Sequence, residues 1–165
     1  VTGVQTCALP IYPFVQKVFE YVGTAKIATS AEEARDQGFL RFSDRVTTDP
    51  DRLIYDAKQL ALGMVEGGYK AQRRRSFKLP GAQGRAAIEL YLYQMQMGGF
   101  VSEHDALIGK KLAYVLTGGD CPSGATRGEQ DILDLEREIF LSLLGTEKTQ
   151  ARIQFMLEKG KPLRN

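Results

Sequence analysis

Residues 126–145, TRGEQDILDLEREIFLSLLG, show most clearly how this chain is expected to fold. Thr126 and Glu129 have the spacing of a capping box, in which two side chains satisfy free backbone N–H groups at a helix start. Gly145 is a residue type that commonly ends helices. Between these signals the apolar residues recur at helical spacing, which predicts a helix with one apolar face: Ile132, Leu133, Leu135, Ile139, Phe140, Leu143 and Leu144.

The same signals recur along the rest of the chain. Ser30 with Glu33 and Ser102 with Asp105 form further capping boxes, and Pro50 stands at the first position of another helix. Together with the apolar spacing they predict about seven helices and a mainly α fold. The predicted helices cover 13–22, 31–37, 50–66, 86–97, 103–116, 129–144 and 147–159.

Three segments lack a helical pattern. Residues 39–46 alternate in polarity, which favours a short extended piece. Residues 69–84 form the least regular stretch, and 120–128 are predicted to be a loop. No convincing set of paired strands is predicted.

Length and composition limit the classes of function. The chain has 165 residues, of which 43% are hydrophobic and 25% charged, and its formal net charge is +2. It is long enough for one domain with a core but too short for a dehydrogenase with separate cofactor and substrate domains. The balanced charge argues against nucleic acid as a partner, and no apolar run approaches the roughly 20 residues of a membrane span. With two Cys and one His, a cysteine-rich metal site or a His-dependent triad is not expected.

Few residues could carry chemistry. The glycine-rich loop 117–124 could offer N–H groups to a phosphate, but a helix end followed by a turn explains it better. His104, Asp120 and Cys121 could suggest a metal or nucleophile, but we interpret them as structural, with His104 in an ordinary surface position. The basic run 73–78 could grip phosphates, although a solvated loop is its default interpretation. No catalytic, cofactor-binding or metal-binding residue is therefore predicted.

The first residues do not look like protein-coding sequence. Residues 1–11, VTGVQTCALPI, resemble a translated sequencing adapter, whose tail would also begin the codon of Tyr12. We therefore expect residues 1–12 to be an unstructured artefact and the native chain to begin at about Pro13, in the middle of a longer protein.

The C-terminal residues carry a family resemblance. The segment from Glu136 to Pro162 contains EREIF, Thr146 and EKGKP, and it resembles the closing helices of the crotonase (enoyl-CoA hydratase/isomerase) superfamily. It departs from the family pattern inside the last helix, at Lys148, at residues 151–152 and at 155–156.

A second segment, residues 23–40, resembles the crotonase segment that follows the active-site half of the domain. The long stretch between the two matches has no counterpart in compact crotonases. With this insertion and with its last residues, 140–165, the chain most resembles the bacterial 3-hydroxyacyl-CoA dehydrogenase fusions of fatty-acid β-oxidation. This resemblance covers nearly all of residues 13–165. The resemblance thus implies the helical C-terminal part of a crotonase-like module with a helical insertion.

The resemblance implies that the chemistry belongs to a longer parent enzyme. In that family NAD binds to a dehydrogenase half upstream, and the hydratase groups also precede this segment. The parent would oxidise 3-hydroxyacyl-CoA and could also hydrate 2-enoyl-CoA in the cytoplasm, whereas the fragment alone would be inactive. It would pack over the acyl-CoA site and mediate contacts with the rest of the parent chain, a second copy or a thiolase subunit.

One binding function could lie within the chain itself. In crotonases a Lys of the terminal element can approach the CoA phosphates, and Lys159 and then Lys161 occupy that place. Two Lys beside a helix C-terminus also simply complement the helix dipole. Two other functions stay open: a non-catalytic helical interaction module using the apolar faces of 53–65 and 132–144, and a nucleic-acid binder using 73–78.

Overall fold

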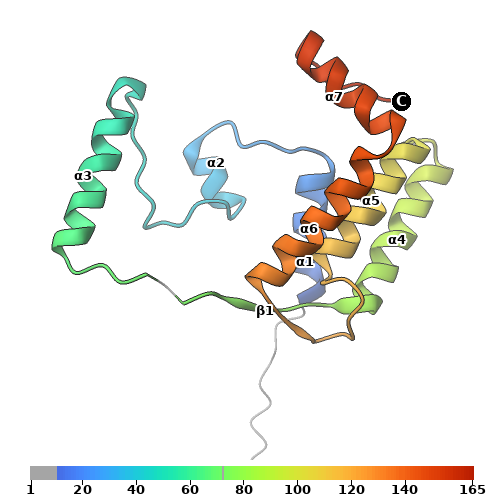
Figure 1. The fold of residues 1–165 in the computed structure, drawn as a ribbon, viewed down its shortest axis with the longest axis horizontal. Helices are drawn as coiled ribbons and strands as arrows, with labels where there is room; N and C mark the ends of the chain where they lie inside the picture. Colours follow the sequence, from blue (N-terminus) through green and yellow to red (C-terminus); the bar gives the residue numbers. More distant parts are fainter. Residues whose placement is uncertain (1–10, 72) are drawn as a thin grey trace, which may run out of the picture. The chain divides into compact units, whose positions relative to one another are not determined.

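The computed structural model describes residues 11–71 and 73–165, and this part of the chain is mainly helical (Figure 1). Seven α-helices account for 62% helix against 4% strand, which confirms the predicted fold class. The helices are α1 (Ile11–Gly23), α2 (Ala31–Asp36), α3 (Leu53–Glu66), α4 (Gly81–Met97), α5 (Glu103–Leu116), α6 (Glu129–Leu144) and α7 (Glu147–Lys159). The short 3-10 helix η1 (Pro50–Arg52) leads directly into α3.

The N-terminal boundary differs from the prediction. Residues 1–10 of the expected adapter lie outside the described residues. Helix α1 begins at Ile11, so the last two residues of the stretch expected to be unstructured are helical. Tyr12 packs against the hydrophobic core, and the origin of this stretch stays a prediction.

The chain divides into two compact units, Lys26–Arg73 and the remainder. The hydrophobic core of the larger unit lies where α1, α4 and α5 meet, and its buried members are Phe19, Ile88, Leu92 and Ala113. Gly109 lets α5 approach α4 closely, because a Cβ there would lie 2.8 Å from Leu92 Cδ2. Because the side chains between these helices are closely packed, the stability of the unit is sensitive to changes in side-chain volume at these positions.

Helix α4 begins at Gly81, five residues before the predicted start at Ala86. The N–H of Gly81 donates to the Thr117 carbonyl (3.1 Å) and that of Ala82 to the Cys121 carbonyl (3.0 Å). These carbonyls satisfy N–H groups that a helix start leaves without partners. The glycine-rich loop therefore caps α4, which local sequence signals do not reveal.

Two short strands were missed by the sequence prediction. Strands β1 (Ser76–Lys78) and β2 (Thr126–Gly128) pair antiparallel, with Phe77 opposite Arg127. Because Thr126 lies in β2, the predicted capping box at Thr126 and Glu129 is wrong. The N-cap of α6 is Gly128, whose N–H donates to the Asp131 carboxylate (2.9 Å).

Of the other two predicted capping boxes, one forms in part and one is complete. Ser30 Oγ accepts from the Glu33 N–H, and the Glu33 carboxylate accepts from the N–H of Thr29 rather than of Ser30. Ser102 and Asp105 form the complete reciprocal box at the start of α5. Residues 39–46 contain turns and bends but no strand, so the predicted extended piece is wrong.

The smaller unit has no buried side chain on its helices α2 and α3 or on η1. The predicted apolar stripe of α3 lies on the surface, with Ile54 84% and Val65 73% exposed. No helix among the described residues is long and apolar enough to cross a membrane.

Candidate functional site

The two predicted ligands of the CoA phosphates lie at the tip of α7. Lys159 is the last residue of that helix, and Gly160 ends it in the left-handed conformation (φ 63°). Lys161 follows directly, and both lysines are exposed. In the described part of the chain neither takes part in an ion pair. Two ammonium groups on either side of one turn are therefore accessible to an anion.

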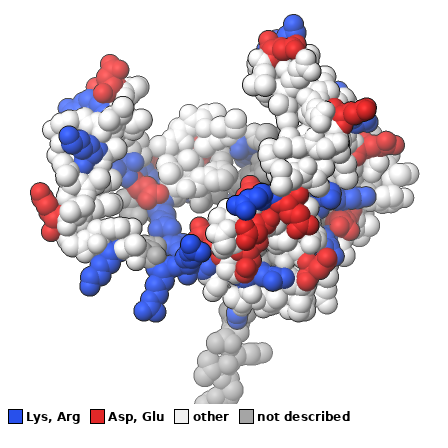
Figure 2. Space-filling view, in the orientation of Figure 1, with Lys and Arg blue, Asp and Glu red and all other residues white. Residues whose placement is uncertain are grey.

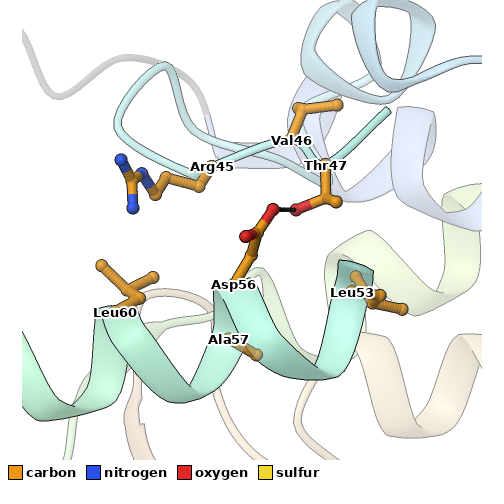
Figure 3. A pocket seen from close by; sticks show the side chains of 7 residues that line it. All are labelled: Arg45, Val46, Thr47, Leu53, Asp56, Ala57 and Leu60. Atoms are coloured by element: carbon orange, nitrogen blue, oxygen red, sulfur yellow. Dashed lines mark hydrogen bonds between the residues drawn. The ribbon is translucent and has the colours of Figure 1, made fainter. Parts of the chain in front are cut away.

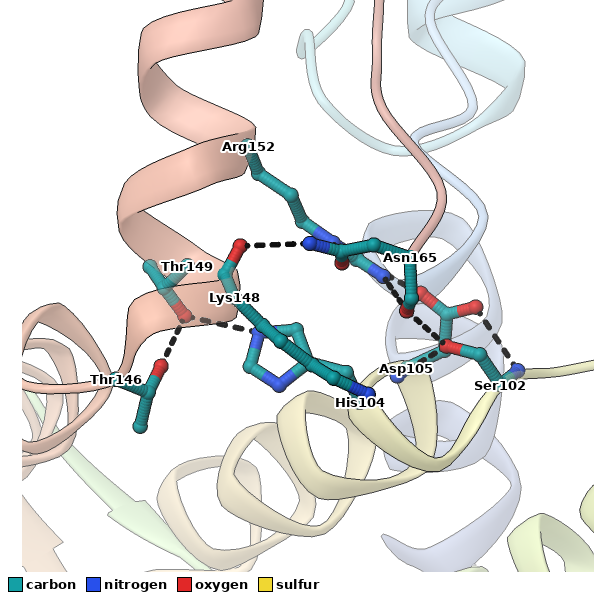
Figure 4. A network of polar contacts seen from close by, with 8 residues as sticks. All are labelled: Ser102, His104, Asp105, Thr146, Lys148, Thr149, Arg152 and Asn165. Carbon is teal, nitrogen blue, oxygen red and sulfur yellow. Dashed lines mark hydrogen bonds and ion pairs between the residues drawn. The ribbon is translucent and has the colours of Figure 1, made fainter.

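Beyond Gly160 the chain returns along α7, so that Asn165 lies beside the first half of the helix (Figure 4). The Asn165 side chain donates to the Lys148 carbonyl through Nδ2 (3.1 Å) and accepts from Arg152 Nε through Oδ1 (2.7 Å). These contacts hold the returning segment against α7 and so restrain the turn between Lys159 and Lys161.

Arg152 joins α7 to the start of α5 (Figure 4). Its Nη1 donates to Asp105 Oδ1 at 2.8 Å, and its Nη2 donates to the Asn165 carbonyl at 3.2 Å. Ser102 Oγ donates to the same carbonyl at 3.0 Å. We call Ser102, Asp105, Arg152 and Asn165 the Arg152 network. It joins the start of α5 to α7 and to the segment that follows α7, and no local sequence motif predicts it.

The Asp105 carboxylate is held in its charged form. Burial alone would raise the pKa of Asp105, but hydrogen bonds from the Ser102 N–H and the Arg152 guanidinium outweigh it and lower the pKa below its ordinary value. The ion pair with Arg152 is partly buried, so it is less screened than a surface pair.

His104 is buried (4% exposed), whereas a surface position was predicted. Its Nε2 lies 3.0 Å from Thr149 Oγ1, which in turn lies 2.8 Å from Thr146 Oγ1. Thr146 donates its single hydroxyl proton to the Leu143 carbonyl (2.7 Å). Thr146, Thr149 and His104 thus form a chain of hydrogen bonds that joins the start of α7 to the first turn of α5.

The charge state of His104 follows from its surroundings. Burial lowers the pKa of the imidazole, and the positive charges of Arg152 and Lys148 lower it further, while Asp105 opposes them. The ring is therefore mainly neutral at pH 7 and holds α7 through the hydrogen bond between its Nε2 and Thr149. It has a structural partner on α7, in agreement with the structural interpretation.

The glycine-rich loop 117–124 has no free donors to offer a phosphate along most of its length. The N–H groups of Gly118, Gly119, Cys121 and Gly124 donate to backbone carbonyls. Cys121 is buried, and its thiol lies against the Thr117 carbonyl. The loop is a helix end followed by a turn, as its default interpretation states.

Asp120 pairs with Arg85 at 2.8 Å. This hydrogen bond raises the pKa of the Arg85 guanidinium, although burial opposes the rise. The described residues contain no group of three or more His, Cys, Asp or Glu side chains that could hold a metal ion.

Part of the basic run 73–78 belongs to β1 and is exposed. Near its partner strand a pocket of about 230 Å³ is lined by Arg127, Asp131, Asp134, Leu135 and Glu138. Figure 2 shows acidic side chains gathered over α6. The carboxylates outnumber the guanidinium in this pocket, which disfavours a phosphate ligand there.

A second pocket, of about 290 Å³, lies within the smaller unit (Figure 3). Leu53, Ala57 and Leu60 of α3 form its apolar side, and residues 45–47 face them. Thr47 Oγ1 donates to Asp56 Oδ2 at 3.3 Å. The Asp56 carboxylate in this pocket is bonded to Thr47, and the charged residue beside it is Arg45. The pocket therefore brings together no pair of groups suited to proton transfer.

The chain is similar in sequence to a protein of a Bacillus species. A protein of Bacillus subtilis (strain 168) described as "Probable 3-hydroxyacyl-CoA dehydrogenase" is 48% identical over 149 residues, which is 90% of this chain. The chain spans only 19% of the length of that relative. No protein-family model and no solved structure matches the chain.

Proposed function

We propose that this chain is a segment of a longer 3-hydroxyacyl-CoA dehydrogenase of fatty-acid β-oxidation. The observation that carries the proposal is the 48% identity to the Bacillus relative over nine-tenths of the chain. In this proposal the parent oxidises the 3-hydroxyl group of an acyl-CoA with NAD, in the cytoplasm. Hydration of 2-enoyl-CoA by a crotonase-like module is part of the same proposal.

The surface of the chain supports a role inside a larger assembly. Large apolar side chains stand exposed on α3, α6 and α7, and Leu157 is 82% exposed. Such a surface suits contacts with further protein. We propose that the segment packs over the acyl-CoA site and contacts the rest of the parent chain, with a second copy or a thiolase subunit as further partners.

The part of the proposal that this chain carries itself is phosphate binding at the tip of α7. Lys159 and Lys161 are exposed, close in sequence and outside the ion pairs described. Lys is a competent phosphate partner as a point charge. The CoA phosphates are the anions that this proposal assigns to them, whereas hydride transfer and hydration belong to residues outside the chain.

Two observations test this function. The DNA upstream of the chain is expected to encode a crotonase active-site half and an NAD-binding domain in the same reading frame. A start codon just before Pro13 would contradict the proposal. The purified chain is expected to produce no NADH from 3-hydroxyacyl-CoA, and measurable turnover would contradict its role as an inactive segment.

A non-catalytic interaction module is the second candidate function. It is favoured by α3, which buries no residue although Leu53, Ile54 and Val65 are apolar and exposed. In this reading α3 and the apolar face of α6 bind a separate protein. An upstream sequence without enzyme domains, together with a stable complex that depends on Ile54 and Val65, would favour the module over the dehydrogenase.

A further inference from the structure

Helix α7 ends at Lys159, the first of the proposed CoA-phosphate lysines, but has little apolar anchorage of its own. None of its residues is buried, and Ile153 and Met156 are 40% and 46% exposed. Its half-buried side chains are Thr149, Arg152 and Phe155. Polar contacts therefore contribute more to the placement of this helix than they do in the core of α1, α4 and α5.

The Arg152 network stands on the same side of α7 as Lys159. Lys159 is seven positions after Arg152, so at 100° per residue their directions differ by about 20°. The two positions are about 10 Å apart along the axis at 1.5 Å per residue. A tilt of about 10° at Arg152 would then move the tip by nearly 2 Å, which is large beside the length of a hydrogen bond.

We propose that Arg152 is a positioning residue, which holds the tip of α7 and thereby sets Lys159 and Lys161 in place for the CoA phosphates. This inference rests on the proposed function of those lysines. Arg152 bonds Asp105 on α5 and also Asn165 at the end of the segment that returns from Gly160. It therefore restrains both the helix that leads to the tip and the segment that leaves it. A planar guanidinium can make these contacts together, whereas the single ammonium of Lys cannot reproduce their geometry.

The experiment is a titration of the isotope-labelled 165-residue chain with CoA, followed through the backbone amide resonances of Lys159, Gly160 and Lys161. Pantetheine, which lacks the phosphates of CoA, is the ligand control. Wild type is expected to show saturable shifts with CoA and none with pantetheine, and Lys159→Ala is expected to lose them.

Two variants separate positioning from charge. Arg152→Lys keeps the charge but loses the planar fork, and we expect about fivefold weaker CoA binding through loss of preorganisation. Asp105→Asn removes a negative charge, so electrostatics alone predicts tighter binding of an anion, whereas positioning predicts weaker binding. Arg137→Lys, an equally conservative change at an exposed site on α6, is expected to bind CoA as wild type does.

The outcomes distinguish the two proposals. Absence of CoA shifts in wild type overturns the CoA site and the positioning role together. Loss of binding in Lys159→Ala with unchanged binding in Arg152→Lys and Asp105→Asn overturns the positioning role alone, as does tighter binding in Asp105→Asn. If either variant fails to fold, Asn165→Ala, which keeps the Arg152–Asp105 pair, must still weaken CoA binding for the proposal to stand.

Discussion

Acidification should destabilise the larger unit through His104, the only histidine of the chain. Burial and the charges of Arg152 and Lys148 lower the pKa of its imidazole in the folded state. The unfolded chain therefore binds a proton at a higher pH than the folded chain does. The stability contributed by the neutral ring is fully present above the unfolded pKa, about 6.5, and is lost as the pH falls below it.

The size of this effect is limited because only one group, the His104 imidazole, takes up a proton. The free energy of unfolding changes by at most about 1.4 kcal/mol per pH unit when one group takes up a proton only on unfolding. The slope should be close to zero above pH 7.5, where both states are neutral at this site. Asp105 adds a second loss only near and below its ordinary pKa of about 4, because its pKa is also lowered by folding.

The assay is urea unfolding at a series of pH values from 8 to 5, followed by circular dichroism. His104→Gln is the matched variant, since its amide can still form a hydrogen bond with Thr149 but does not titrate. We expect the wild-type curve to fall below about pH 6.5 and the variant curve to stay flat down to about pH 5. A flat wild-type curve, or an imidazole that titrates above 6.5 in the folded chain, would show that His104 does not destabilise the fold on acidification.

Three further changes test the fold. Ile88→Ala should lower the free energy of unfolding by about 2–5 kcal/mol in urea unfolding, because Ile88 is 1% exposed in the core. Gly81→Ala should abolish the stable start of α4, since the φ of 59° disfavours a side chain and a Cβ would overlap the Cys121 carbonyl; wild-type stability would contradict the capping role of the loop. Arg85→Met should cost less than about 1 kcal/mol, because its partner Asp120 is 76% exposed.

Signals that act over one helical turn were predicted well from the sequence. Ser102 and Asp105 cap α5 as expected, and Gly160 ends α7 in the left-handed conformation. These residues act on backbone groups within a few positions of themselves, so their effect does not depend on the rest of the fold.

Features made by distant segments could not be predicted in this way. Strand β2 overrides the local capping signal of Thr126 because it pairs with β1, some fifty positions away in the sequence. His104 is buried because α7 covers it, and the pattern of its own helix cannot reveal that contact. The Arg152 network likewise depends on the return of the segment after Gly160, which no spacing rule contains.

A chimera shows whether this chain can serve as a segment of a 3-hydroxyacyl-CoA dehydrogenase, as proposed. The chain from Pro13 onward replaces its aligned segment in the Bacillus relative, and NADH production from 3-hydroxyacyl-CoA is measured. We expect the chimera to oxidise this substrate at a rate close to that of the unchanged relative, measured beside it as the active control. A folded chimera without activity, beside an active relative, would contradict the claim.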